Sequence, residues 1–278
     1  MCKMLAAAIS NGSLLSRLIK QHEFFLKPPE TFEADGYGVG YYLDERPLLS
    51  KLPRLATPPK TYYEMVKDIN SNLLILHARR ATVGGWKDEN THPFRFEPWL
   101  FAHTGTAELL QKRRSELYEN LPTHLRNNIK GDTDSELLFM LILSNLGDLY
   151  QITSNVISEQ KVITAIRKTL SQLGYSLNDF SEHSGAIFLT NGNLLLALSC
   201  GEPLHMRVQD VPPPMEDKEG ESAHYKKSDV SESGNSLFKS VLLAVSSQKA
   251  VMGFEPIEPG TIIIVHKSLE IMRAKLSE

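Results

Sequence analysis

Short apolar runs, each about the length of one buried β-strand, recur along most of this chain of 278 residues. Gly, Asn and Pro residues separate them, which is the pattern of strands joined by turns. No run reaches the roughly 18 residues that a membrane-spanning helix needs. The clearest runs are "KMLAAAI" (3–9), "GYGVGYYL" (36–43), "NLLILHARR" (72–80), "PWLFAHTG" (98–105), "GAIFLT" (185–190), "NLLLALS" (193–199), "PLHMRVQ" (203–209), "SVLLAVSS" (240–247) and "TIIIVHK" (261–267).

Helical spacing of apolar residues is strongest in the middle of the chain. Residues 133–146 open with the capping-box pair Thr133 and Glu136, and residues 158–173 form an amphipathic pattern. A capped helix is also predicted near the start, over residues 10–25. Strands, two central helices and further strands predict an α+β fold in layers. We expect one domain over residues 1–278, with a long flexible loop at residues 211–236, where the sequence is polar and rich in proline.

Composition excludes several classes of protein. A net charge of −3 and a pI near 6.3 give no electrostatic reason to expect a nucleic acid or an anionic membrane as partner. Two cysteines do not make a disulfide scaffold and suit a reducing compartment. The first apolar run is short and lacks a basic leader, so no secretory signal is expected. We expect a cytoplasmic protein.

Cys2 stands directly after the initiator methionine. If Met1 is removed, Cys2 carries a thiol and a free α-amine, which together can act as nucleophile and base. The alternative is a small hydrophobic residue at the start of a buried strand, a common role for a lone cysteine.

Four polar clusters follow apolar strands or begin a helix, where a rigid scaffold can hold a site. Each cluster taken alone is also compatible with a surface arginine, a turn, a strand end or a helix cap. His77, His92 and His103 could be pictured as metal ligands, but their spacing contains no close pair on a helix, and no metal is expected. No glycine pattern fits a nucleotide-binding loop, and no cofactor is expected. The clusters are "HARRATVGG" (77–85), "ENTHPF" (89–94), "FAHTG" (101–105) and "GDTDSE" (131–136).

Together with Cys2, these clusters resemble the class II glutamine amidotransferases, which are N-terminal-nucleophile (Ntn) hydrolases. The chain looks like their stand-alone, glutaminase-type branch, whose motifs are "MC", "ADGWG", "H-x-R-x-AT-x-G", "N-x-HPF", "F-x-HNG" and "D-x-TDSE". This chain has "MC", "ADGYGVG", "HARRATVG", "NTHPF", "FAHTG" and "GDTDSE" in the same order. The late "LLAVSS" and "GFEPIEPGTIIIV" also resemble the closing strands of that branch. The resemblance therefore covers nearly the whole chain.

The resemblance implies a four-layer αββα sandwich, Ntn-hydrolase-like, with two stacked, mainly antiparallel sheets flanked by helices. It also implies hydrolysis of a side-chain amide through a γ-glutamyl thioester on Cys2. The residues suit this chemistry. Arg79 has a planar fork for the α-carboxylate of the substrate, and Asp134 at a helix start can bind its α-ammonium group. The N–H of Gly105 can donate to the oxyanion of the intermediate.

In the family, the threonine that matches Thr82 and the histidine that matches His92 line the same pocket. Thr104 departs from the pattern, because relatives carry an asparagine there whose amide donates to the oxyanion. Threonine has a shorter reach and one hydroxyl donor, so it either substitutes in part, marks a change of substrate or lowers activity. Tyr37 in place of tryptophan is a milder change. Cys200 lies in an apolar run and is expected to be a core thiol.

Two functions remain open at this point. The first is an enzyme that cleaves glutamine or a related γ-glutamyl compound and releases ammonia or an amine, either alone or with a separate synthase subunit. The second is a non-catalytic or weakly active relative that binds a γ-glutamyl ligand or a partner protein, with Thr104 as its mark. Retention of Cys2, Arg79 and Asp134 favours the enzyme.

Overall fold

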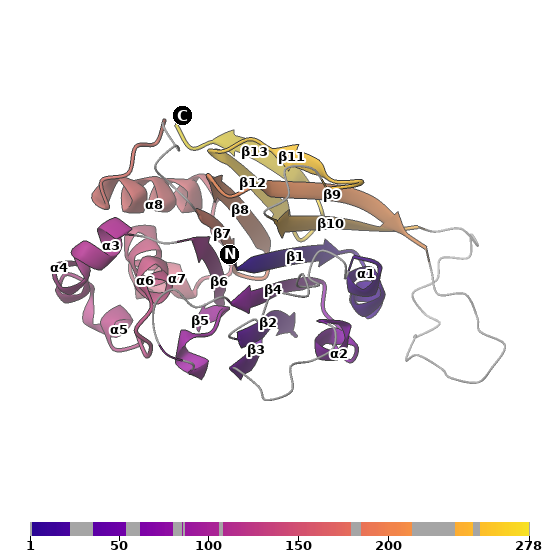
Figure 1. Cartoon of the computed structure of the whole chain (residues 1–278), viewed down its shortest axis with the longest axis horizontal. Helices are drawn as coiled ribbons and strands as arrows, with labels where there is room; N and C mark the ends of the chain where they lie inside the picture. Colours follow the sequence, from indigo (N-terminus) through magenta and orange to yellow (C-terminus); the bar gives the residue numbers. More distant parts are fainter. Residues whose placement is uncertain are drawn as a thin grey trace.

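Two antiparallel sheets lie against each other in the computed structural model (Figure 1). The structure describes residues 2–22, 36–53, 62–79, 85, 87–105, 108–178, 185–212, 237–246 and 251–277. Thr82 and residues 213–236 of the predicted flexible loop lie outside these ranges. Val211 belongs to a strand, so the loop prediction began one residue too early.

The first sheet has seven strands, and β1 lies in its interior between two strands that are distant in sequence. β1 pairs with β10 on one side and with β4 on the other, both antiparallel. In spatial order the strands are β11 (Glu255–Ile257), β9 (Leu204–Val211), β10 (Phe238–Val245), β1 (Lys3–Ile9), β4 (Leu73–Arg79), β2 (Gly36–Leu43) and β3 (Arg46–Pro53).

The second sheet has six strands and places β6 between β7 and the short β5. Its order is β13 (Ile271–Lys275), β12 (Thr261–His266), β8 (Leu194–Cys200), β7 (Gly185–Thr190), β6 (Trp99–Gly105) and β5 (Phe94–Phe96). Each of its ladders between named strands is antiparallel.

The alternation of side chains along β1 explains the stacking. Met4, Ala6 and Ala8 pack in the core between the sheets, whereas Leu5, Ala7 and Ile9 pack in a second core with α1 (Leu15–Gln21) and α2 (Tyr62–Val66). Successive residues of a strand point to opposite faces, so a strand that is apolar throughout must be covered on both sides. β1 is therefore a buried strand between two layers.

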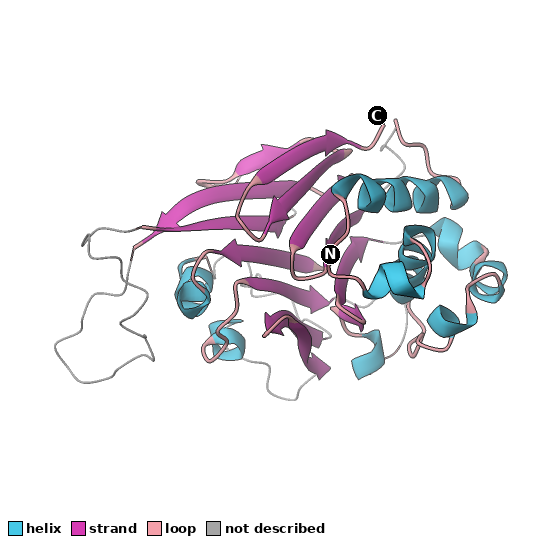
Figure 2. Cartoon of the chain, turned by 180° about the vertical axis from the view of Figure 1, so that it is seen from behind, coloured by secondary structure: helices cyan, strands magenta, loops and turns pink. Residues whose placement is uncertain are grey.

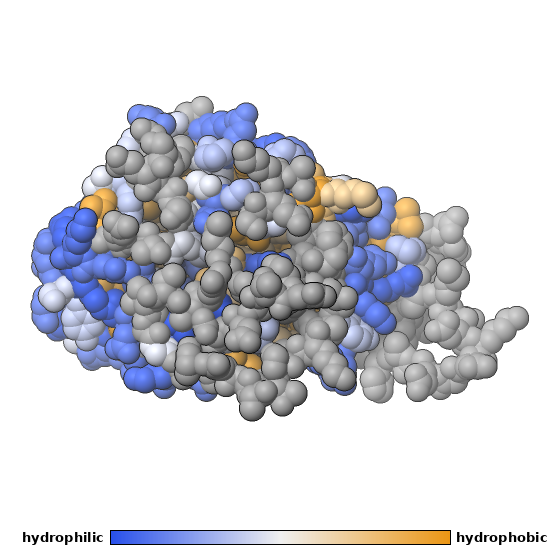
Figure 3. Space-filling view, in the orientation of Figure 1, coloured by the Kyte–Doolittle hydropathy of each residue, from blue (hydrophilic) through white to orange (hydrophobic). Residues whose placement is uncertain are grey.

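The outer face of the second sheet is covered by the other helices (Figure 2). The longest are α6 (Asp134–Leu146) and α8 (Glu159–Gln172), which bury Phe139 and Ile166 against this sheet. The shorter ones are α3 (Glu108–Lys112), α4 (Arg114–Glu119), α5 (Thr123–Arg126) and α7 (Leu149–Thr153). Figure 3 shows that the visible surface over α4 and α5 is mostly hydrophilic, as expected for short outer helices. The order helix, sheet, sheet, helix confirms the predicted αββα sandwich.

Most predicted elements are present close to their expected bounds, including β1, β4, β6 and α6. The helix predicted near the start begins as a 3-10 turn, η1 (Gly12–Leu14), which Asn11 caps through its side chain, and continues as α1. β3, β5, β11 and β13 were not predicted. Among the described helices, none has the length and apolarity to cross a membrane.

The cap of α6 only partly follows the capping-box prediction. Thr133 Oγ1 accepts the N–H of Glu136 at 3.3 Å, as predicted. The Glu136 carboxylate does not return to the cap residue and instead accepts the N–H groups of Lys130 at 3.0 Å and Gly131 at 2.7 Å. It thereby fixes the turn that leads into α6.

Candidate active site

Cys2 and Arg79 meet at one end of the first sheet. In the β1–β4 ladder, Lys3 lies opposite Ala78 and Met4 opposite His77. Continued by one residue, this register sets Cys2 opposite Arg79, where paired Cα atoms lie about 4.5 to 5.5 Å apart. Cys2 is partly exposed, whereas Arg79 is only 3% exposed. The register of the sheet therefore leads a partly exposed cysteine toward a buried arginine.

Thr104 faces the same space from the second sheet. It shares a face of β6 with Leu100 and Ala102, which pack between the sheets, and it is itself buried. Cys2 and Arg79 continue the faces of β1 and β4 that point into this interlayer, because side chains alternate along each strand. The three residues therefore face one another from opposite layers.

Gly105 ends β6 with a φ of 107°, a conformation that glycine adopts at low cost. It pairs with Gly185 at the start of β7.

Asp134 begins α6 beside His103, the residue that precedes Thr104. The Nδ1 atom of His103 lies 2.9 Å from Ser135 Oγ. Ser135 donates its N–H to Asp134 Oδ1 at 2.9 Å. All three side chains are buried. The start of α6 is thus tied to the strand that carries the predicted oxyanion residues.

The His92 ring packs against the His77 ring, with centroids 4.3 Å apart and the ring planes tilted by 32°. Both rings are buried, and none of their four ring nitrogens makes a hydrogen bond of normal geometry within the described residues. Burial lowers the pKa of His77 to about 3, against a smaller opposing effect of the His103 backbone. Burial also lowers the pKa of His92 well below its usual value, with the neighbouring His77 and His103 adding to the effect. Both imidazoles are therefore neutral near pH 7.

The turn that carries His92 lies directly on β2. A Cβ atom added at Gly38 would collide with the His92 carbonyl oxygen, so only glycine fits there. The peptide bond between His92 and Pro93 is cis. Gly38 in the "GYGVG" run therefore allows a close approach of this turn to β2.

Asn90 joins this turn to the start of α6. Its Nδ2 donates to Gly85 O at 3.1 Å, and its Oδ1 accepts the N–H of Asp132 at 2.9 Å. Arg79 Nη1 also donates to Gly85 O, at 3.2 Å. One carbonyl therefore connects the Arg79 strand with the Asn90 turn.

Lys51 of β3 lies beneath the same turn. Its ammonium group donates to Asp88 O at 3.1 Å and lies 5.2 Å from the centre of the Phe94 ring. Burial lowers the pKa of Lys51 to about 8, although Glu136 and Asp88 oppose the shift. Lys51 thus adds a positive charge next to His92, and its lowered pKa makes its proton easier to lose than that of an ordinary lysine.

The structure brings several predicted site residues together and adds two. Cys2, Arg79 and Thr104 face one interlayer space, and Asp134 is linked through Ser135 to the Thr104–Gly105 strand. Ser135 and Asn90 were not singled out from sequence, although both lie inside the quoted motifs "GDTDSE" and "ENTHPF". Thr82 is outside the described residues. The described residues contain no cluster of three His, Cys, Asp or Glu side chains suited to a metal ion.

Cys200 contrasts with Cys2. It packs against the core between the second sheet and α6, and burial raises its pKa to about 12. A thiol of such high pKa is a poor nucleophile at neutral pH, because the thiolate is the reactive form.

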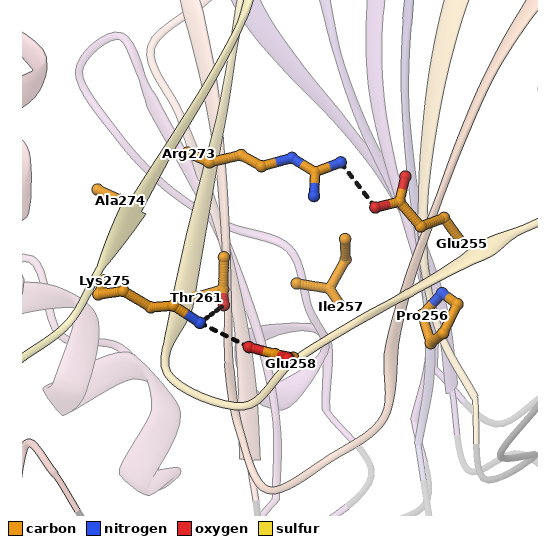
Figure 4. Close-up of a pocket in the computed structure, with 8 residues that line it drawn as sticks. All are labelled: Glu255, Pro256, Ile257, Glu258, Thr261, Arg273, Ala274 and Lys275. Carbon is orange, nitrogen blue, oxygen red and sulfur yellow. Dashed lines mark hydrogen bonds and ion pairs between the residues drawn. The ribbon is translucent and has the colours of Figure 1, made fainter.

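A hollow of about 420 Å³ lies away from these residues, between the edge strands β11 and β13 (Figure 4). Two ion pairs cross it, Arg273 with Glu255 and Lys275 with Glu258, each at 2.8 Å. The hollow lies where the open edges of the two sheets meet. Its cations are already paired with carboxylates, and it has no nucleophile.

A family model for class II glutamine amidotransferases matches residues 1–267. The chain belongs to this family. The resemblance seen in the motifs is therefore confirmed, and the family connects the fold with glutamine as the amide donor.

Relatives by sequence agree with this assignment. A Haemophilus influenzae protein named as a candidate glutamine amidotransferase is 28% identical over 186 residues, which is 64% of this chain and 56% of that protein. The Escherichia coli candidate glutamine amidotransferase YafJ is 28% identical over 187 residues, 64% of this chain and 65% of its own length. The chain thus matches less than two thirds of the length of these relatives.

Solved structures share the fold. A glutamine aminotransferase class-II domain protein from Silicibacter pomeroyi superimposes with a TM-score of 0.60 at 16% identity, over all of both chains. Glutamine phosphoribosylpyrophosphate amidotransferase from B. subtilis gives 0.56 at 14% identity, over 99% of this chain and 49% of that one. A predicted glutamine amidotransferase from Pseudomonas aeruginosa gives 0.53 at 16% identity, over 99% of each chain. At these identities the likeness concerns the fold alone.

Proposed function

We propose that this protein cleaves the side-chain amide of glutamine or a related γ-glutamyl compound, with Cys2 as the nucleophile. The thiolate attacks the amide carbon, a γ-glutamyl thioester forms, and ammonia or an amine leaves. Water then releases glutamate and restores the thiol. Removal of Met1 supplies the α-amine of Cys2 as the base for these steps.

The observation that carries the proposal is the β1–β4 register, which brings Cys2 opposite Arg79 when it is continued by one residue past Lys3 and Ala78. A γ-glutamyl substrate has its scissile carbonyl and its α-carboxylate at opposite ends of a short chain. A partly exposed sulfur and a buried guanidinium on neighbouring strands can hold both ends of one such molecule. Arg79 is thus the proposed ligand of the α-carboxylate.

The other roles follow from the resemblance to the family. Asp134 binds the α-ammonium group, and Gly105 N–H with the Thr104 hydroxyl stabilises the oxyanion. His92 lines the pocket as a neutral ring, and Thr82 completes it. The reaction needs no metal or cofactor, because the nucleophile, base and oxyanion donors all come from the chain.

The test measures glutamate release from glutamine, glutathione and γ-glutamyl amides, together with the intact mass of the purified protein. Wild type should lack Met1 and release glutamate, whereas Cys2→Ala should lose more than about a thousandfold of the activity and keep the fold. Cys200→Ser is the matched control, because this other thiol packs on the α6 side of the second sheet, has a raised pKa and should leave release unchanged. A Cys2→Ala protein as active as wild type would contradict the mechanism.

Thr104 supports a second candidate function, a relative that binds a γ-glutamyl ligand or a partner without turning it over. Its side chain is buried where relatives have the oxyanion asparagine. Such a protein would bind glutamine in calorimetry and release no glutamate from any amide. Ammonia transfer to a separate synthase subunit is a further outcome, seen as release that rises when that subunit is added.

A further inference from the structure

A buried chain of polar contacts runs from β6 to the carboxylate of Asp134. His103 Nδ1 lies 2.9 Å from Ser135 Oγ, and Ser135 Oγ lies 3.5 Å from Asp134 Oδ1. The Ser135 hydroxyl has one hydrogen. We assign it to the carboxylate, which can only accept, so that His103 Nδ1 carries a proton and donates to the hydroxyl. With this assignment the order of donors is imidazole, hydroxyl, carboxylate.

His103 is fixed in place by its surroundings. Its ring stacks over Phe101, with centroids 6.4 Å apart, and a Cβ atom added at Gly185 would lie 3.1 Å from His103 Nε2. Gly185 pairs with Gly105, the predicted oxyanion residue. The imidazole thus lies between the end of the oxyanion strand and the first turn of α6.

We propose that His103 and Ser135 are positioning residues that orient the Asp134 carboxylate for the α-ammonium group of the substrate. They thereby determine the preference of the enzyme for amides that carry an α-amino group over amides that lack one. This inference rests on the proposed function, in which Asp134 is the ligand of that group.

The physical reason is the loss of orientation when the chain is broken. Asp134 Oδ1 accepts the Ser135 N–H at 2.9 Å, a contact that tolerates rotation of the carboxylate. The hydroxyl, held by His103, adds a second donor and limits that rotation. A charge-assisted hydrogen bond to the substrate needs a fixed carboxylate, and a misplacement of about 1 Å can cost up to a hundredfold in rate.

The experiment compares glutamine with 4-carbamoylbutanoate, which is glutamine without its α-amino group. In Ser135→Ala, we expect kcat/KM for glutamine to fall about tenfold, mainly through KM, because the α-ammonium contact is present in both ground and transition states. The values for 4-carbamoylbutanoate should stay within about twofold of wild type. Asp134→Asn should abolish the preference for glutamine, so it gives the largest change in the ratio between the two substrates that Ser135→Ala could approach.

Three further variants separate positioning from stability. Ser71→Ala removes another buried serine hydroxyl, at the far end of β4 from Arg79, and should lower thermal stability without changing the ratio between the two substrates. Ser135→Thr keeps the hydroxyl and should restore most of the preference. The double variant His103→Phe with Ser135→Ala removes both partners, so it should recover stability relative to Ser135→Ala but not the preference.

The inference is overturned if wild type hydrolyses glutamine and Ser135→Ala leaves the ratio of kcat/KM between the two substrates unchanged. This holds whether both values fall equally or neither changes. If wild type releases glutamate neither from glutamine nor from the other γ-glutamyl compounds tested, the proposed function fails and the inference fails with it. These two failures differ in the wild-type measurement, which is made first.

Discussion

The two ends of the space between the sheets bury polar groups in different ways. Near Cys2, the rings of His77 and His92 are buried with no hydrogen bond of normal geometry within the described residues. At the opposite end, the Tyr42 hydroxyl lies 2.7 Å from Pro98 O and 3.0 Å from Thr190 O and shares its one hydrogen between these two carbonyls. There the Ser71 hydroxyl also bonds to the backbone of Leu73, at 2.7 Å.

The difference separates structural from functional burial. A buried polar group without a partner costs about 1 to 3 kcal/mol, and most such groups in proteins are satisfied. The Tyr42 end meets this requirement with backbone carbonyls, so its polar groups stabilise the fold. The His77 end does not meet it, and titratable groups shifted by burial are typical of active sites. The predictions below test this contrast.

Arg79→Lys should have the largest effect of these changes. We expect KM for glutamine to rise about a hundredfold with kcat changed only a few fold, because an ammonium cannot make the bidentate contact with a carboxylate. Steady-state kinetics check this result, with circular dichroism as the control for folding. An unchanged KM would remove Arg79 from substrate binding and weaken the distinction between the two ends.

Thr104→Asn should raise kcat by about tenfold to a hundredfold with little change in KM. The asparagine amide adds an oxyanion donor, which acts in the transition state alone. Paired kinetics on a γ-glutamyl amide measure the gain. A loss of activity on the native compound would indicate a change of substrate, and no turnover by either form would favour the binding role.

Acid should destabilise the protein through His77. Its folded pKa of about 3 lies below the ordinary value of 6.5, so the unfolded chain binds a proton first as the pH falls. The stabilising contribution is complete above about pH 6.5 and is lost progressively toward pH 3, by about 1.4 kcal/mol per pH unit. Urea unfolding of wild type at several pH values should show this slope.

His77→Phe should reduce the dependence of the free energy of unfolding on pH by the amount that one proton contributes. His124→Gln in α5 is the control. The comparison uses the difference between wild type and each variant, because other carboxylates and histidines also titrate in this range. Identical slopes in wild type and His77→Phe would mean that the His77 environment is not what the packing indicates.

Tyr42→Phe should have the smallest effect, and on stability alone. It leaves the carbonyls of Pro98 and Thr190 without the hydroxyl donor, at a cost of about 1 kcal/mol in the free energy of unfolding. Glutamate release should stay unchanged. A marked loss of activity would show that the two ends are coupled.

The sequence by itself determined most of the strands, the two long helices and the family. Apolar runs such as residues 3–9 and 99–105, bounded by polar and turn residues, predicted buried strands correctly, and the Thr133 cap marked the start of α6. These signals are local, so they are readable without a partner strand. The short elements β5, β11 and α2 were not predicted, because a few residues carry little propensity and are held by packing. β3 is longer, but proline and charged residues interrupt its apolar pattern.

Only the tertiary structure decided which polar groups meet. The register that leads Cys2 toward Arg79 exists because β1 inserts between β10 and β4, and its first pair, Lys3 with Ala78, spans more than 70 residues of sequence that no local pattern encodes. The contacts of His103 with Ser135 and of His77 with His92 likewise depend on how β6, α6 and the turn before β5 pack. Side-chain periodicity determines which face a residue occupies, whereas strand order and register determine what it faces.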